Sequence, residues 1–241
     1  MPRDVGVVLV AAGEGRRMVA PASGPRFTEV PKQFLPIAGV PMLLRALRPF
    51  TSHPDVRQVV LVLPASHAAA PPAWLAQLAG DQLRIVAGGA ERMDSVEQGL
   101  RALPAECTLV LVHDAARPLL RRDTVDAVIG QARKGTGAIA AVPVSDTLKE
   151  SGPEGTVPQI RRTIPRDGLW RAQTPQGFPR PMLERAYAAA RKDQATGTDE
   201  AALVERLGEP IMLVPDSAWN IKVTTPEDLV LAELIAASER S

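Results

Sequence analysis

The alternation of apolar, strand-length runs with helix-like segments constrains this chain most. Five runs are rich in valine, leucine, isoleucine and alanine: Val5–Ala12, Val56–Leu63, Leu83–Val86, Leu109–Val112 and Gly137–Pro143. Runs of this kind are typical of strands that are buried on both faces of a parallel sheet. Helical segments lie between them, so we predict right-handed crossovers and an α/β fold. Its mostly parallel, twisted sheet is expected to carry helices on both faces.

Helical spacing separates these runs and continues after them. The expected helices are Pro41–Phe50, Ala73–Leu78, Asp94–Ala102, Thr124–Arg133, Pro181–Lys192 and Asp199–Leu207. Two late strands are expected at Ile211–Val214 and Trp219–Val223. Thr225-Pro226-Glu227-Asp228 predicts the start of a last helix, with Thr225 as N-cap and acidic side chains facing the helix dipole. No internal repeat is visible, and we expect one domain over residues 1–241.

One segment, Asp146–Trp170, interrupts the strand–helix pattern. It is polar and turn-rich, and Thr156–Ile164 alternates crudely, as an exposed hairpin does. An excursion of this length inside an α/β domain is uncommon unless it has a function. We predict that residues 146–170 form an arm that projects from the body and grips a second subunit.

Composition excludes several classes of protein. The net charge of +1 gives no bulk electrostatic attraction to nucleic acid or to a membrane, so any anion site must be local. No apolar run is long enough to span a bilayer, and the chain does not begin with a signal-peptide pattern. Cys107 is the only cysteine, and its apolar surroundings favour inert packing. We therefore expect a cytoplasmic protein.

A glycine-rich loop follows the first predicted strand, in Ala11-Ala12-Gly13-Glu14-Gly15-Arg16-Arg17-Met18. Glycines let the backbone approach a ligand and direct N–H groups at an anion. Neither the Walker pattern nor the dinucleotide Gly-x-Gly-x-x-Gly spacing is present. The alternative is a tight turn with two solvated arginines. Lys32 follows the Pro-, Gly- and Ser-rich stretch Val19–Val30, from which it can reach a triphosphate from the opposite side.

Further motifs follow in order along the chain. They are Pro31-Lys32-Gln33, His113-Asp114-Ala115-Ala116-Arg117-Pro118, Asp146-Thr147-Leu148-Lys149, Thr174-Pro175-Gln176, Thr198-Asp199-Glu200 and Asn220-Ile221-Lys222-Val223-Thr224. With the glycine-rich loop, they resemble the 2-C-methyl-D-erythritol 4-phosphate cytidylyltransferases of the non-mevalonate isoprenoid pathway, over roughly the whole chain. The resemblance implies a Rossmann-type nucleotidyltransferase fold, a homodimer, Mg²⁺ as cofactor, and transfer of CMP from CTP to the methylerythritol phosphate.

Two alternatives to this activity remain. Ribitol-5-phosphate cytidylyltransferases share many of the motifs, so another polyol phosphate is a possible acceptor. A nucleotide-binding regulatory protein without turnover is the second alternative. A protein without turnover has no need of all the charged residues that the reaction uses, yet all five are present: Arg17, Lys32, Asp114, Arg166 and Lys222.

The resemblance also assigns roles to residues. Arg17 and Lys32 stabilise the transition state, and Arg166 and Lys222 hold the acceptor for attack. The nucleotide loop supplies Ala11, Ala12, Gly13 and Gly15. The turn with Gly88, Gly89 and Ser95 reads the cytosine, and the acceptor also meets Arg117, Thr147, Thr174 and Thr198.

Two features depart from the family pattern: the length of one loop and the residue at position 219. The loop from Val19 to Val30 is longer than is usual in the family, and a longer lid would close only over nucleotide. Trp219 is bulky for a position near the acceptor and either alters the pocket or packs outward.

Asp114 follows a buried strand, so we expect it at the carboxyl edge of the sheet as an Mg²⁺ ligand; the alternative is a turn aspartate.

Overall fold

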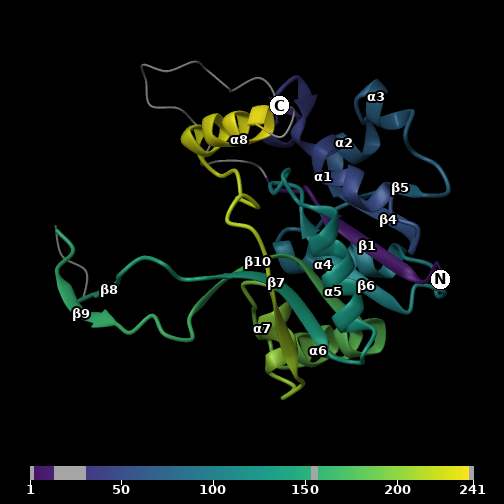
Figure 1. The fold of residues 1–241 in the computed structure, drawn as a ribbon. Coiled ribbons are helices and arrows are strands. Elements are labelled where there is room, and N and C mark those ends of the chain that lie inside the picture. Colours follow the sequence, from purple (N-terminus) through teal and green to yellow (C-terminus); the bar gives the residue numbers. More distant parts are fainter. Residues whose placement is uncertain (1–2, 14–30, 153–156, 239–241) are drawn as a thin grey trace.

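The computed structural model describes residues 3–13, 31–152 and 157–238, and it centres on a seven-stranded sheet (Figure 1). The strands lie in the order β11-β7-β10-β6-β1-β4-β5. Their bounds are β1 Val5–Val10, β4 Val56–Leu63, β5 Leu83–Ala87, β6 Leu109–Asp114, β7 Gly137–Pro143, β10 Trp170–Pro179 and β11 Ile211–Pro215. Strand β10 runs antiparallel to both its neighbours, β6 and β7, and the other pairs are parallel. The prediction of a mostly parallel sheet is confirmed.

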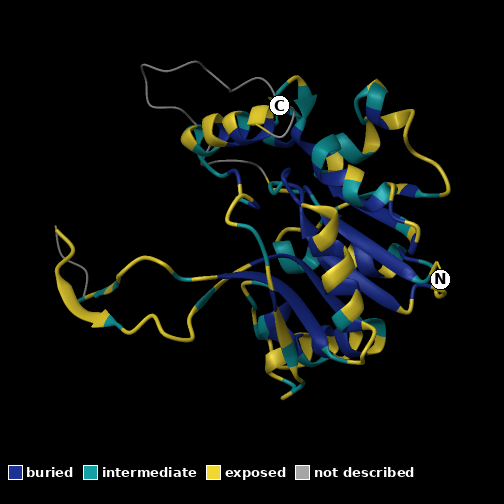
Figure 2. Cartoon of the chain, in the orientation of Figure 1, coloured by how far each residue is buried: buried dark blue, intermediate teal, exposed yellow. Residues whose placement is uncertain are grey.

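Helices cover both faces of this sheet, as predicted. One face packs against α1 Met42–Thr51, α3 Ala73–Ala76 and α5 Arg122–Ala132, and the other against α4 Arg92–Ala102, α6 Arg180–Lys192 and α7 Glu200–Glu205. Side chains alternate along each strand, so Val7 and Leu9 belong to one core and Val8 to the other. Strand β6 is buried at every position and β1 at every position except Val10, which explains their continuous apolar sequence (Figure 2).

A third apolar cluster lies above the carboxyl edge of the sheet. It joins α8 Pro226–Ser238 to β2 Pro36–Ile37 and to the start of α1. The short elements η2 Lys32–Phe34 and β3 Val40–Pro41 flank β2 along the chain. Thr225 caps α8 as predicted: its hydroxyl accepts from Asp228 N, and the Asp228 carboxylate accepts from Thr225 N. A short helix, α2 Ala65–Ala69, completes the elements near this edge. Among the described helices, none combines the length and the apolar character that a bilayer crossing requires.

Two expectations about strands are wrong. Strand β10 was not predicted, because Arg171, Gln173, Thr174 and Gln176 make it polar. The last three of these side chains are nevertheless buried, each with hydrogen-bond partners in neighbouring segments. The segment Trp219–Val223, predicted to be a strand, consists of a turn and irregular backbone.

The predicted arm is present as an exposed hairpin. Strands β8 Leu148–Ser151 and β9 Ile160–Ile164 pair antiparallel with each other and with no strand of the main sheet (Figures 1 and 2). The hairpin extends away from the body on two irregular stretches, which Val144 N and Leu169 O join at their base, 3.0 Å apart. Residues 153–156, between the strands, lie outside the described part of the chain.

Candidate active site

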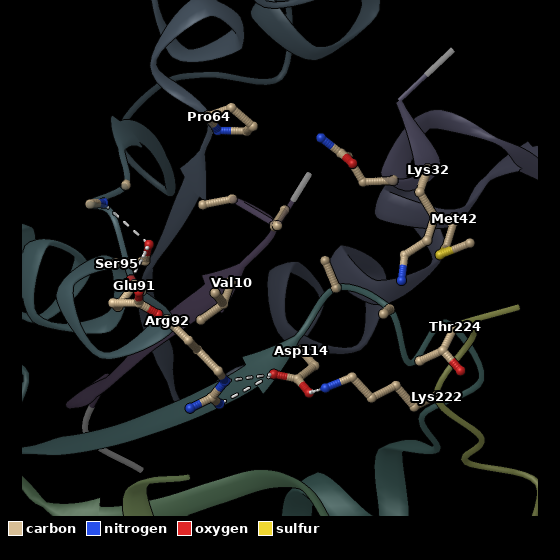
Figure 3. Close-up of a pocket in the computed structure, with 18 of the residues that line it drawn as sticks. Val10, Lys32, Met42, Pro64, Glu91, Arg92, Ser95, Asp114, Lys222 and Thr224 are labelled. Carbon is tan, nitrogen blue, oxygen red and sulfur yellow. Dashed lines mark hydrogen bonds and ion pairs between the residues drawn. The ribbon is translucent and has the colours of Figure 1, made fainter. Parts of the chain in front are cut away.

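A cavity of about 700 Å³ opens where four parallel strands end. The residues that follow β1, β4 and β5 and the last residue of β6 line one side, and Lys32, Lys222 and Thr224 line the other (Figure 3). Ligands of open α/β sheets bind in this position, because the loops at the carboxyl ends of the strands enclose a crevice there. The predicted site residues Ala11, Ala12, Gly13, Lys32, Gly88, Gly89, Ser95, Asp114 and Lys222 all line this cavity.

The turn after β5 forms the cavity wall opposite the two lysines. A Cβ on Gly88 would lie 2.6 Å from the Ala12 Cβ and 2.7 Å from the Ser95 Oγ, so only glycine fits beside the β1 loop. The Ser95 hydroxyl donates to Glu91 O and accepts from Gly89 N, at 3.1 and 3.2 Å. Ser95 therefore shapes this turn through its own hydrogen bonds, in addition to lining the cavity.

Asp114 is the central anion of the cavity. Its Oδ2 lies 2.6 Å from Lys222 Nζ and its Oδ1 lies 3.2 Å from Arg92 Nη2 (Figure 3). Burial by itself would raise the pKa of this carboxyl, but Arg92 and Lys222 outweigh burial and lower it well below its usual range. Asp114 is therefore ionised throughout the physiological pH range and binds two cations.

A chain of hydrogen bonds fixes the backbone of Asp114 from below. The Thr174 Oγ1 accepts from Asp114 N at 3.1 Å and lies 2.8 Å from His113 Nδ1, and His113 Nε2 lies 3.1 Å from Arg117 O. A carbonyl only accepts, so Nε2 carries the proton and Nδ1 accepts from the threonine hydroxyl. Burial lowers the pKa of His113 to about 4, so this imidazole is neutral. Thr174 thus positions Asp114 and does not line the cavity.

Sequence reasoning missed several residues that line the cavity, among them Arg92, which binds Asp114. It is the first residue of α4, and its guanidinium binds Glu200 as well as Asp114. A signal was present in the sequence, because an arginine in the first turn of a helix faces the positive end of the helix dipole. That unfavourable position indicates that a carboxylate from another element pairs with the side chain.

Comparisons with known proteins agree with this geometry. Residues 5–238 match the profile of the IspD family, 2-C-methyl-D-erythritol 4-phosphate cytidylyltransferase. The enzyme of that name from Symbiobacterium thermophilum is 42% identical over 98% of this chain and 94% of its own length. That from Syntrophus aciditrophicus is 39% identical over 99% and 98%. The crystal structure of the Thermus thermophilus enzyme of that name, 36% identical, superposes with a TM-score of 0.76 and covers 95% of this chain and 98% of its own.

The chain belongs to the IspD family. It is a cytidylyltransferase, and its reaction makes the cytidine diphosphate ester of methylerythritol from CTP and 2-C-methyl-D-erythritol 4-phosphate. Among the two acceptors that the motifs left open, the family match favours methylerythritol phosphate over ribitol phosphate.

Several site residues expected of an IspD enzyme lie away from the cavity within this chain. Arg166 and Thr147 lie exposed on the arm, where the Arg166 guanidinium donates to Ser145 O. Thr198 is exposed ahead of α7. Arg117 donates to Asn220 O at 2.7 Å, so it ties the segment that carries Lys222 to the loop after β6. Arg17, Gly15 and the predicted lid Val19–Val30 lie outside the described residues.

The two lysines reach the cavity from different elements, Lys32 from η2 and Lys222 from the segment that precedes α8. Lys32 Nζ donates to Val223 O at 2.7 Å, one residue beyond Lys222. The backbone at 219–223 bonds outside any strand ladder: Asn220 N donates to Ser217 O and Val223 N donates to Ala116 O. The Asn220 side chain anchors this segment by donating to Thr174 O and Asp216. Trp219 is 52% exposed and does not line the cavity, so it packs outward.

Two carboxylates line the described cavity: the Glu91 side chain caps α4, which leaves Asp114 as the candidate ligand for the metal that the family implies. In the described part of the chain, no group of three or more His, Cys, Asp or Glu side chains gathers around a common point. Mg²⁺ is ordinarily bound by one or two carboxylates together with substrate phosphates and water. A single ionised aspartate beside a triphosphate-sized cavity fits that requirement.

Proposed function

We propose that the cavity at the carboxyl ends of β1, β4, β5 and β6 carries out the cytidylyl transfer with Asp114, Lys32 and Lys222 at its centre. The observation that supports this most directly is the carboxylate of Asp114, 2.6 Å from Lys222 Nζ. One cavity there holds an anion that suits a metal and cations that suit phosphates. Transfer of a phosphoryl-type group depends mainly on positioning and on electrostatic stabilisation, which such a set provides.

In the proposed reaction, a phosphate oxygen of the acceptor attacks the α-phosphorus of CTP. The bond from that phosphorus to the bridging oxygen of pyrophosphate breaks, and pyrophosphate leaves with the electron pair. Lys32, together with Arg17, offsets the negative charge that builds up at the α-phosphate. Lys222 holds the acceptor phosphate in line, with Arg166 as the second cation, because a dianion is best bound by two.

Asp114 would hold Mg²⁺ through a carboxylate oxygen, with the triphosphate completing the coordination. The bound metal would neutralise triphosphate charge and orient the phosphates for in-line attack. Both carboxylate oxygens are paired with cations, which keeps Asp114 ionised, the form that binds a metal.

We further propose that the whole chain, residues 1–241, acts as one domain with residues 146–170 as a dimerisation arm. A lone two-stranded hairpin is marginally stable in water, yet β8–β9 projects with Val157 and Ile160 exposed. A two-fold dimer gives both arms the same support. Arg166 would then complete the acceptor site of the partner subunit. The cytoplasmic location expected from the sequence likewise remains a prediction.

The experiment that tests the activity measures pyrophosphate release. The protein is incubated with Mg²⁺ and CTP and with either 2-C-methyl-D-erythritol 4-phosphate or ribitol 5-phosphate, and ATP replaces CTP in a parallel series. We expect release only with CTP and much faster with the methylerythritol ester, since the small residues Gly88, Gly89 and Ser95 line the cavity and favour a pyrimidine over a bulkier purine. Comparable release from ATP would refute the assignment of CTP as the nucleotide. Comparable rates with ribitol 5-phosphate would refute the assignment of 2-C-methyl-D-erythritol 4-phosphate as the acceptor.

A further inference from the structure

Arg92 connects two carboxylates that lie on different elements. Its Nη1 and Nη2 donate to the two oxygens of Glu200 at 2.8 and 3.0 Å, a bidentate pair. The same Nη2 and the Nε donate to Asp114 Oδ1 at 3.2 and 3.4 Å (Figure 3). A planar guanidinium held at two points by one carboxylate has little freedom to turn, so the direction of its remaining donors is set.

Glu200 provides a rigid support for this guanidinium. Its side chain is 1% exposed, and the Tyr187 hydroxyl donates to its Oε1 at 3.1 Å. Glu200 begins α7, and the Gln176 side chain of β10 binds the start of that helix through Asp199 Oδ2 and Ala201 N. Burial by itself would lower the pKa of Arg92, but Glu200 and Asp114 raise it, so the side chain is always charged.

The consequence concerns the orientation of Asp114. Because Arg92 occupies Oδ1, the other oxygen, Oδ2, is the one that meets Lys222. Arg92 is also the first residue of α4, whose start forms the turn with Gly88 and Ser95. One side chain therefore joins the wall assigned to the nucleotide base to the residues assigned to the acceptor.

We propose that Arg92, supported by Glu200, is a positioning residue for cytidylyl transfer. It holds the Asp114 carboxylate in the rotamer that presents Oδ2 to Lys222, and it does not itself bind CTP. This role rests on the function proposed above, since its purpose is to align the acceptor side of that site. Loss of Arg92 should therefore reduce acceptor use and leave unchanged the binding of CTP in the absence of Mg²⁺, to which the Asp114 carboxylate contributes no metal.

The test separates binding of CTP from use of the acceptor. The variant Arg92→Met removes the donors at similar length, and Glu200→Gln weakens the support without touching Asp114. Arg101→Met is the matched control, on the same helix but exposed and paired only with Glu97. Calorimetry with CTP alone, without Mg²⁺ or acceptor, gives the CTP affinity independently of the metal on Asp114, and pyrophosphate release gives kcat and KM for the acceptor.

We expect kcat/KM for the acceptor to fall about 10- to 100-fold in Arg92→Met and in Glu200→Gln, as when a group that orients a ligand is removed. CTP affinity should stay at the wild-type level, and Arg92→Lys, which keeps the charge, should recover part of the loss. A fall in CTP affinity as large as the fall in kcat/KM would mean that Arg92 is a nucleotide ligand. Wild-type kcat/KM in Arg92→Met would mean that it has no role.

Two further experiments keep the inference testable if a single variant fails to fold or the activity is absent. Removing one partner of a buried ion pair is destabilising, whereas replacing both with apolar side chains often is not, so the double variant Arg92→Met/Glu200→Met serves as the folded substitute. A crystal structure of that variant should show the Asp114 carboxylate rotated and its contact with Lys222 lost. An unchanged contact would overturn the positioning role, even if the wild type released no pyrophosphate and the proposed function itself failed.

Discussion

The cavity and the arm hold their cations in contrasting ways. In the cavity, Lys222 and Arg92 bind the same carboxylate, Asp114, within 2.6 and 3.2 Å. On the arm, Arg166 lies exposed and donates to a backbone carbonyl, that of Ser145, on the opposite stretch at the base of the arm. A cation in the cavity is thus positioned by the fold of one chain, whereas a cation on the arm has only local partners. This contrast fits the proposal that a second chain completes the acceptor half of the site, and the following predictions test it.

The largest effect should come from the centre of the cavity. We expect Asp114→Asn to lower kcat about 100- to 1,000-fold, as removal of one preorganised electrostatic group does. A neutral amide is a poor Mg²⁺ ligand and no longer attracts Lys222. Pyrophosphate release at several Mg²⁺ concentrations measures the change, and circular dichroism checks the fold. If the variant turned over at the wild-type rate in limiting Mg²⁺, Asp114 would be a structural turn residue.

The next effect tests whether the arm acts across subunits. Arg166→Ala and Lys222→Ala should each lower kcat/KM for the acceptor about 10- to 100-fold, since each removes a charged hydrogen bond to phosphate. Mixed and allowed to exchange subunits, the two variants should regain about a quarter of wild-type activity, because half the dimers are mixed and each has one intact site.

The control for that experiment is Arg161→Ala, an exposed arm arginine that pairs with Glu150. On its own, this variant should keep full activity. Mixed with Lys222→Ala, it should give only the activity that its own fraction of the subunits contributes. If subunits exchange but the first mixture stays inactive, both cations act within one chain and the arm is only a contact.

A smaller effect concerns stability against pH beneath the cavity. The pKa of His113 is lowered to about 4 by burial, whereas the unfolded chain has the ordinary value near 6.5. The unfolded state therefore binds more protons between these values, and stability falls as pH drops from about 6.5 to about 4. At pH 4.5 the loss should be about 2 kcal/mol relative to pH 7. Denaturant unfolding of wild type and His113→Gln at both pH values measures it, and equal pH dependence in the two proteins would contradict the assignment.

The smallest effect is expected at Thr174. Thr174→Val removes the hydroxyl that joins Asp114 N to His113 Nδ1, and the loss of a buried partner should cost about 1 to 3 kcal/mol of unfolding free energy. Because the carboxylate is then less well placed, kcat should fall by less than in Asp114→Asn. Thr174→Ser keeps the hydroxyl and should retain both stability and kcat. An unchanged kcat in Thr174→Val would mean that Thr174 does not contribute to the position of Asp114 during the reaction.

Most of the body could be predicted because its strands are buried on both faces. Val56–Leu63 and Gly137–Pro143 have the predicted bounds, since a continuous apolar run has few other places in a folded chain. Strand β10 could not be predicted in this way. Its buried Gln173, Thr174 and Gln176 are stable there only because Asn220, His113 and Asp199 supply hydrogen bonds from distant segments. The predicted strand at Trp219–Val223 was wrong for a similar reason: its backbone bonds outside any strand ladder, and the Asn220 side chain anchors it to β10.

By itself, the sequence determined the fold class, the family and the presence of an arm, because these depend on local periodicity and on ordered motifs. Only the tertiary structure decided which of those motif residues meet. It brought Lys32, Asp114 and Lys222 together in one cavity, directed Thr174 beneath Asp114, and revealed Arg92 between Asp114 and Glu200. The physical reason is that a buried charge at the carboxyl edge of the sheet is stable only beside opposite charges from other elements. Such partners lie far apart in the sequence, so no local sequence pattern identifies them.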